Sequence, residues 1–395
     1  MKKNIDKQTP HVLLLIILVG FPQISETIFS PSLPAISSAF HISMSQVQLT
    51  MSIYFIAFAI GVLFFGRLSD YIGRRKALLL GVAFYFVGNM LCFFAKDLSF
   101  LLVARFIQAF GASVGSVITQ TILREAFTGV KRHQLFAQIS AALAFTPAIG
   151  PLIGGFTDYY LGFKMMFIVL IVMSVSIFVY AYLRLPETAP QQQTIQPLTP
   201  IMKRMATNTR LWHYALLIGG INGILFSYYA EAPFIFTQYF TLTSAQFGFL
   251  GIIVALASIT GALLSKRLVS HIMPEKIIVL GIIIMLVGSI LTLVTAMMPA
   301  IIQLWLMIGS LFIVLLGNGM ALPNCLSLAL NDFQDVVASA GAVFSLVYYL
   351  LVSLITYGMS VWHDGTLTAM PYYFLCIGIV MLIASIRILQ RHTTQ

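Results

Sequence analysis

Charged residues and cysteines are both scarce in this 395-residue chain. Asp, Glu, Lys and Arg make up 9% of the sequence and 59% of the residues are hydrophobic, whereas about 25% of the residues in soluble proteins are charged. Such a chain cannot cover a water-exposed surface, which excludes a soluble enzyme, a nucleic-acid-binding domain and a disordered scaffold. The three cysteines have neither metal-ligand nor disulfide-framework spacing, so we interpret them as packing residues: Cys92, Cys325 and Cys376.

Motifs for ATP hydrolysis and metal binding are also missing. The sequence has no Gly-x-x-x-x-Gly-Lys-Ser/Thr loop for the phosphates of ATP, and no His, Cys and carboxylate cluster at metal-site spacing. We therefore expect no cofactor, no metal and no primary active transport by this chain alone. The polar loops are too short for a separate catalytic site, so the protein is predicted not to be an enzyme.

Apolar residues form twelve long segments separated by short polar turns. About 20 residues suffice for one crossing, and a segment in lipid must satisfy its backbone hydrogen bonds internally, as a helix does. The first segment is too long for a signal peptide and contains no small-residue cleavage site. We predict an all-α polytopic membrane protein with spans at 12–38, 47–66, 77–95, 99–122, 135–157, 164–185, 212–239, 246–265, 276–297, 301–322, 337–361 and 370–389.

Basic residues mark one side of the membrane. All but three of the 22 Lys and Arg residues fall in tails and loops on the side of the N-terminus, and the exceptions are Lys96, Lys164 and Arg105. The positive-inside rule then predicts that both termini are cytoplasmic. A multi-pass protein of a bacterial inner (cytoplasmic) membrane is expected.

A Pro- and Gln-rich loop divides the chain into two similar halves. At an offset of 200 residues, Gly61, Arg67 and Lys76 meet Gly261, Arg267 and Lys276, and such internal repeats are typical of secondary transporters. The predicted organisation is an N-terminal tail (1–11), a six-helix bundle (12–185), a cytoplasmic linker (186–211), a second six-helix bundle (212–389) and a C-terminal tail (390–395).

The turn after the second segment carries an unusual set of residues at 66–76. Anchoring at the cytoplasmic surface explains its basic cluster, but it explains neither the Asp nor the two glycines. The turn resembles the signature loop of the major facilitator superfamily, whose fold is two pseudo-symmetric six-helix bundles that alternate in access. The resemblance implies a cytoplasmic gate formed by Gly66, Arg67, Asp70, Gly73 and Arg74. In the second half, Ser270 replaces the Asp.

The fifth segment combines prolines with closely spaced glycines. Proline removes a backbone donor and glycine permits close helix contact and bending, so an ordinary kinked, tightly packed helix would explain the pattern. The run also resembles the motif that marks antiporters within the superfamily, although Thr146 replaces its leading Gly. The motif residues are Pro147, Gly150, Pro151, Gly154 and Gly155.

Three charged side chains lie inside apolar segments. An Arg inside the bilayer costs at least a few kcal/mol unless it is paired or hydrated, and Arg105 resembles the Arg that the family associates with proton coupling. At about 1.5 Å per residue, Glu26 falls at nearly the same depth, so the two can pair. Alternatives are an Arg105 that snorkels to the interface, a permanent structural salt bridge between Arg105 and Glu26, and a Glu231 that is merely solvated at the outer mouth.

Stretches around both carboxylates resemble the Bcr/CflA branch of drug:proton antiporters, namely 25–26, 31–36, 54–61, 232–234 and 246–248. Aromatic and amide side chains within the segments can line an adaptable cargo cavity, although each is individually more typical of packing. The candidate cargo-binding residues are Tyr54, Phe58, Gln108, Phe145, Asn222, Tyr228, Tyr229, Asn318 and Tyr348, with Tyr349 beside the last.

We therefore expect a proton-coupled exporter, or antiporter, of small molecules, with proton coupling at Glu26, Arg105 and Glu231. Its cargo would be lipophilic or cationic drugs, or a native metabolite such as a siderophore. The expected partners are cargo, protons and the lipid bilayer, with no nucleic acid, and the protein is expected to be monomeric. The alternative on the same fold is a proton-coupled symporter that imports a small metabolite. A passive channel and an intramembrane enzyme are disfavoured.

Overall fold

A computed structural model describes residues 10–127, 129–189 and 197–393, so most of the N-terminal tail, seven linker residues and the chain end lie outside it. Secondary structure in the described ranges is entirely helical. The N-terminal half contains α1 (Val12–Thr27), η1 (Ser30–Ser32), α2 (Leu33–Phe40), α3 (Met44–Ile72), α4 (Arg74–Phe94), α5 (Leu98–Ala126), α6 (Gly129–Leu143), α7 (Thr146–Leu161) and α8 (Phe163–Arg184).

The C-terminal half repeats this pattern after a short helix in the linker. Its elements are α9 (Leu198–Thr207), α10 (Thr209–Phe234), η2 (Ile235–Tyr239), α11 (Ser244–Leu268), α12 (Pro274–Thr295), α13 (Ala300–Leu328), η3 (Asn331–Val336), α14 (Val337–Trp362) and α15 (Ala369–Thr393). Eleven stretches in the described part of the chain are long and apolar enough to cross a membrane. The remaining predicted segment, 212–239, is the 26-residue α10 followed by η2.

Two of the spans are broken. The first consists of α1 and α2 joined through η1, and the fifth consists of α6 and α7 with a turn at residues 144–145. Proline follows each break, Pro31 and Pro34 in the first span and Pro147 in the fifth. Because proline lacks a donor and disfavours helical geometry in the preceding residue, both breaks follow from the sequence.

The structure corrects two expectations about element boundaries. Several helices extend past the predicted spans, such as α3, which ends at Ile72 rather than at residue 66, because helical hydrogen bonding continues beyond the apolar run. The linker was also expected to be a loop, whereas α9 occupies part of it. Its apolar residues Ile201 and Met205 are buried, and the helix packs against α14.

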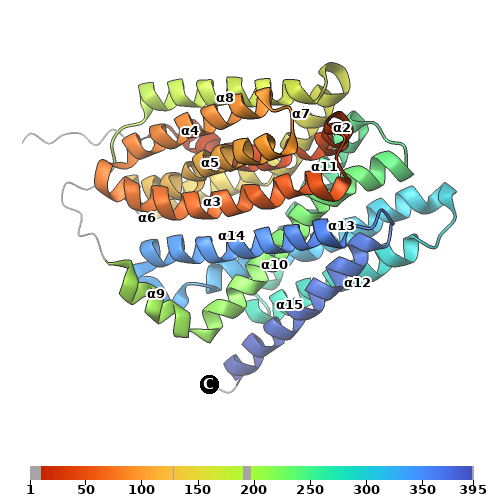
Figure 1. Ribbon diagram of the computed structural model, residues 1–395. Helices are drawn as coiled ribbons and strands as arrows, with labels where there is room; N and C mark the ends of the chain where they lie inside the picture. Colours follow the sequence, from red (N-terminus) through yellow and green to blue (C-terminus); the bar gives the residue numbers. More distant parts are fainter. Residues whose placement is uncertain (1–9, 128, 190–196, 394–395) are drawn as a thin grey trace, which may run out of the picture.

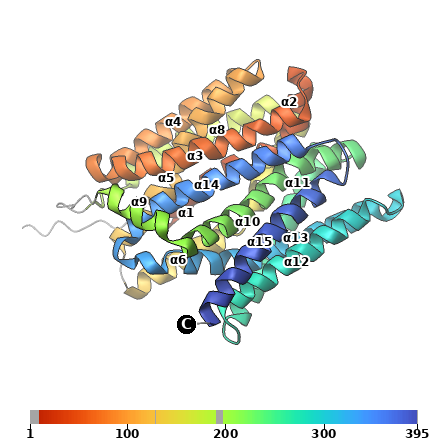
Figure 2. The same cartoon turned by 60° about the horizontal axis from the view of Figure 1, so that its bottom comes forward.

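The helices of the two halves lie side by side (Figure 1). The halves meet where α3 packs against α14 and α7 packs against α11, and the rotated view shows α3 and α14 running alongside each other (Figure 2). We call the end that holds residues 41–43, 240–243 and 363–368 the outer end, following the predicted orientation. The linker helix α9 lies at the opposite end.

Candidate transport site

The side chain of Arg105 on α5 is completely buried between two aromatic rings. Its guanidinium carbon lies 4.4 Å from the ring centroid of Phe29 and 4.4 Å from that of Tyr54. Nη1 donates a hydrogen bond to Oε1 of Gln108 at 2.5 Å, and Gln108 in turn bonds to Asn89 on α4. Nε and Nη2 have no hydrogen-bond partner within the part of the chain that the structure describes. The site thus holds a desolvated cation on aromatic faces, with two donors available.

Glu26 on α1 belongs to the same site. It is 4% exposed, and Arg105 is the cation that interacts with it electrostatically. Within the described residues, Glu26 and Arg105 do not form an ion pair with each other at 4.0 Å or less. The structure thus brings the two buried side chains into one electrostatic environment without a salt bridge between them.

Aromatic side chains from three helices form a cluster next to Arg105, at the contact between the two halves. Phe55 of α3 lies 4.4 Å from Phe226 of α10, and Phe58 lies 4.8 Å from Tyr349 of α14, between ring centroids. We define this aromatic cluster as Tyr54, Phe55, Phe58, Phe226, Tyr228, Tyr229, Tyr348 and Tyr349. It contains five of the nine predicted cargo residues.

The other predicted cargo residues lie elsewhere. Gln108 contacts Arg105, as described above. Phe145 precedes α7 at the helix break and is 56% exposed. Asn318 on α13 donates to the carbonyl of Ile221 on α10, while Asn222 donates to the carbonyl of Ile218 one turn away in its own helix. Asn318 thus lies at the α10–α13 contact, and its buried Oδ1 has no partner in the described structure.

Hydrogen bonds between the two halves gather at the outer end. Serines and one glutamine of the N-terminal half bond to the C-terminal half, and we call the four bonded pairs the outer seam: Ser30–Tyr229, Ser45–Ser360, Gln48–Glu231 and Ser52–Ser353. All eight residues lie in η1 or in the outer halves of α3, α10 and α14. The structure is therefore closed at its outer end.

Glu231 is part of this seam and is not solvated, which contradicts the alternative interpretation of a Glu at the outer mouth. It is 1% exposed. Its Oε2 accepts from Nε2 of Gln48 at 2.6 Å, and Nδ1 of His363 lies 2.7 Å from its Oε1. Neither partner was predicted from the sequence. The one available signal was a histidine directly after an apolar segment.

The glycines of the antiporter-like motif lie on two faces of α7. A Cβ at Gly150 or Gly154 would meet Thr27 at the end of α1, or Ile28 directly after it, within the same half. A Cβ at Gly155 would instead meet Ser244 and Gly248 of α11 in the other half. The carbonyl of Pro147 accepts a hydrogen bond from the hydroxyl of Tyr229 at 3.0 Å, so this segment also connects the halves.

Arg74 organises the predicted cytoplasmic gate. Its guanidinium pairs with Asp70 at 2.6 Å and with Glu125 of α5 at 2.7 Å. Glu187, which follows α8, accepts the backbone N–H groups of Arg74 and Arg75 at the start of α4. The other gate residues Gly66, Arg67 and Gly73 lie on α3 and at the α3–α4 turn, where Gly73 has a φ of +92°. Glu125 and Glu187 were not predicted.

Comparison with known proteins assigns this architecture to a family. The model of the Major Facilitator Superfamily matches residues 15–356. The chain belongs to this superfamily. It is 32% identical to an uncharacterized transporter of Rickettsia bellii over 93% of both chains. It is also 27% identical to a chloramphenicol resistance protein of Pseudomonas aeruginosa, over 90% of this chain and 84% of the relative.

Other matches agree with this assignment. The chain is 24% identical to multidrug resistance protein D of Escherichia coli over 84% of both chains. In structure it resembles a D-xylose-proton symporter with a TM-score of 0.76 at 14% identity, over 95% of this chain and 96% of the other. The predicted fold is confirmed. The protein is a multi-pass membrane transporter of small molecules and not an enzyme, as expected.

Proposed function

We propose that this transporter exports lipophilic or cationic small molecules from a bacterial cytoplasm across the inner membrane in exchange for protons. The observation that carries the proposal is the juxtaposition of Glu26 and Arg105, both buried and not ion-paired to each other, with the aromatic cluster between the halves. The arrangement supplies a protonatable group, a fixed cation and apolar surfaces in one place. The names of the drug-resistance relatives, and the resemblance to Bcr/CflA antiporters, support export.

The charges of the site explain how a proton and a cationic cargo would compete. With Glu26 ionised, it compensates the charge of Arg105, and a cation can stack on the aromatic rings. Proton binding to Glu26 leaves Arg105 uncompensated, which repels a cation. At an effective dielectric constant of about 20, two unit charges about 4 Å apart interact by about 4 kcal/mol, and even half of that energy is roughly 30-fold in affinity.

The seam and the gate would supply alternating access. In the structure, hydrogen bonds close the outer end, whereas the Arg74 network ties α3, α4 and α5 together at the opposite end. Opening the outer end requires the outer seam to break as the two halves rock apart. The Gly155 face of α7 suits such a movement, because it presents a smooth surface to α11 of the other half.

Proteoliposomes test the proposal directly. Purified protein is reconstituted with an internal pH dye, and an imposed proton gradient is followed while lipophilic cations, chloramphenicol or siderophores are added. We expect proton movement opposite to cargo flux, and at least a roughly tenfold decrease in Glu26→Gln. Glu275→Gln makes the same chemical change at a buried carboxylate at the start of α12, and it controls for general damage.

Three outcomes contradict parts of the proposal. Proton and cargo movement in the same direction would make the protein a symporter that imports its substrate. Coupling that survives Glu26→Gln and disappears in Glu231→Gln would move the proton site to the outer end. A response to siderophores alone would replace drug efflux with the export of one native metabolite.

A further inference from the structure

Glu231 of the outer seam pairs with a second ionisable side chain, His363, which the transport chemistry proposed above does not use. Nδ1 of His363 lies 2.7 Å and 2.9 Å from the two carboxylate oxygens of Glu231. The side chain of His363 is 9% exposed and that of Glu231 is 1% exposed. The imidazole therefore lies between the outer solution and a carboxylate that is out of contact with water.

Glu231 connects this histidine to the other half of the molecule. Gln48 of α3 is fully buried and donates to Oε2 of Glu231 at 2.6 Å. A buried carboxylate that loses its charged partner is left with a desolvation penalty of several kcal/mol, and one amide donor does not remove it. The contact between Gln48 and Glu231 thus depends on the charge state of His363.

The environment of His363 favours its charged form in the closed structure. The hydrogen bond to Glu231 raises the pKa of His363, desolvation opposes this rise, and the charges of Glu231 and Asp364 add to it. The pKa of Asp364 is itself lowered by hydrogen bonds from the hydroxyl and N–H of Thr366, so Asp364 remains an anion. From α3 the pair faces the neutral Gln48, and from α10 the ring of Phe234.

We propose that His363 takes up a proton from the outer solution and that the resulting imidazolium closes the outer seam. It does so by pairing with Glu231 while Glu231 accepts the hydrogen bond from Gln48. This inference rests on the alternating access of the proposed function. His363 acts as a gate residue and not as the proton carrier, because it faces the outer solution in the closed structure and returns its proton there when the seam opens. The carrier remains Glu26.

Linkage gives the direction of the effect. A group that binds its proton more tightly in the closed state shifts the equilibrium toward that state when it is protonated. The pairing of His363 with Glu231 is complete below the ordinary imidazole pKa of about 6.5. It is lost as the pH rises through the raised pKa that His363 has in the closed state. Acidic outer solution therefore favours closure, which in an antiporter is the step that follows proton binding from outside.

Distance measurements between spin labels test this gate without any cargo. Labels at Lys96→Cys and Met297→Cys report on the outer loops of the two halves, in a protein whose exposed Cys376 is replaced by Ala. A Glu26→Gln background removes the other protonation event. We expect the closed-to-open ratio to fall roughly tenfold or more between pH 5 and pH 9, because a hydrogen bond to a charged group, as between His363 and Glu231, contributes about 1.5–3 kcal/mol, which is at least about a factor of ten.

Two variants and one control decide the outcome. His363→Gln and Glu231→Gln should each abolish the pH dependence. Ser360→Ala removes an uncharged bond of the outer seam, so it should lower the closed-to-open ratio by the same factor at every pH. A flat titration of the parent protein, or an unchanged titration in His363→Gln, would overturn the gate.

Cargo-driven proton flux separates this result from the proposed antiport. If no cargo moves protons, antiport fails, while a pH-dependent closure that His363→Gln abolishes still supports the gate. If cargo does move protons but His363→Gln leaves closure unchanged, antiport stands and the gate is wrong.

Discussion

A single methyl group at Gly155 should favour the outward-open state. A Cβ at this position would come 3.2 Å from Cα of Gly248 and still closer to the carbonyl oxygen of Ser244, both in α11 of the other half. These contacts are to backbone atoms, which cannot rotate away. Overpacking of this kind costs typically 1–3 kcal/mol, and here it acts only while the halves are closed at the outer end. Gly155→Ala should therefore shift the closed-to-open ratio by about 5- to 150-fold.

The adjacent glycine provides the matched control. A Cβ at Gly154 would press against the backbone carbonyl of Ile28 within the same half, so the strain of Gly154→Ala exists in both states. We expect Gly154→Ala to lower the midpoint of thermal unfolding without changing the conformational ratio, and Gly155→Ala to change the ratio in the spin-label distances described above. Equal ratios in the two variants would refute the assignment of Gly155 to a contact that opens.

Two further substitutions test the buried cations. Arg105→Lys keeps the charge but loses the planar group that stacks on two rings and donates to Gln108. Cargo-driven proton flux should therefore fall by roughly tenfold while the protein still folds. Unchanged flux would show that only the charge matters. Glu125→Gln removes a charge-assisted bond to the buried Arg74 and should reduce the free energy of unfolding by about 1–3 kcal/mol. A denaturation midpoint equal to that of the parent protein would contradict the structural role of this pair.

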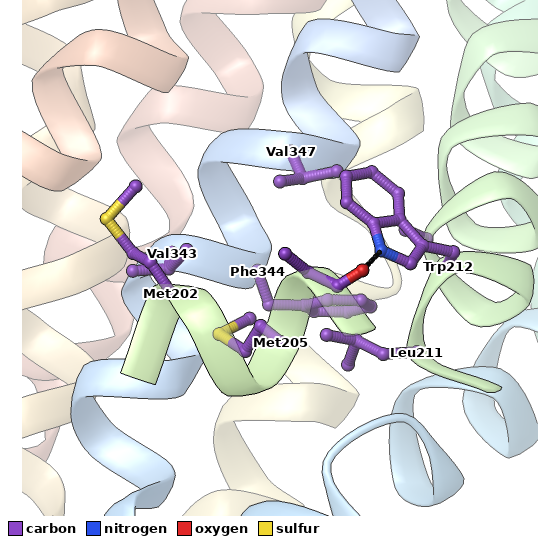
Figure 3. A pocket seen from close by; sticks show the side chains of 9 residues that line it. Met202, Met205, Leu211, Trp212, Val343, Phe344 and Val347 are labelled. Carbon is purple, nitrogen blue, oxygen red and sulfur yellow. Dashed lines mark hydrogen bonds between the residues drawn. The ribbon is translucent and has the colours of Figure 1, made fainter. Parts of the chain in front are cut away.

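The helical architecture could be predicted from the sequence because it depends on local properties. Apolar runs of bilayer length fixed the membrane segments, and Pro147 indicated the kink that separates α6 from α7. The linker helix α9 escaped prediction because its ten residues are amphipathic rather than apolar, and they are stable only against the end of α14. Figure 3 shows Met202, Met205 and Phe344 on the two walls of the apolar pocket that this contact leaves.

The candidate site was predictable only in part. Glu26 and Arg105 stand out because an ionisable residue is expensive inside an apolar helix, and helix geometry alone placed them at one depth. The partners of Glu231 could not be found in this way. Gln48 and His363 are 183 and 132 residues away along the chain, and the packing of α3, α10 and α14 against one another brings them to Glu231.

The outer seam is weak enough for one proton to control it. Hydrogen bonds between helices in a membrane contribute about 0.6 kcal/mol each on average, so the four pairs from Ser30–Tyr229 to Ser52–Ser353 together supply roughly 2–3 kcal/mol. A hydrogen bond to a charged group, such as the one between His363 and Glu231, contributes about 1.5–3 kcal/mol. The two energies are similar, so under the proposed gate the charge state of His363 decides whether the outer seam is closed: a much stronger seam would stay closed at any pH, and a much weaker one would stay open.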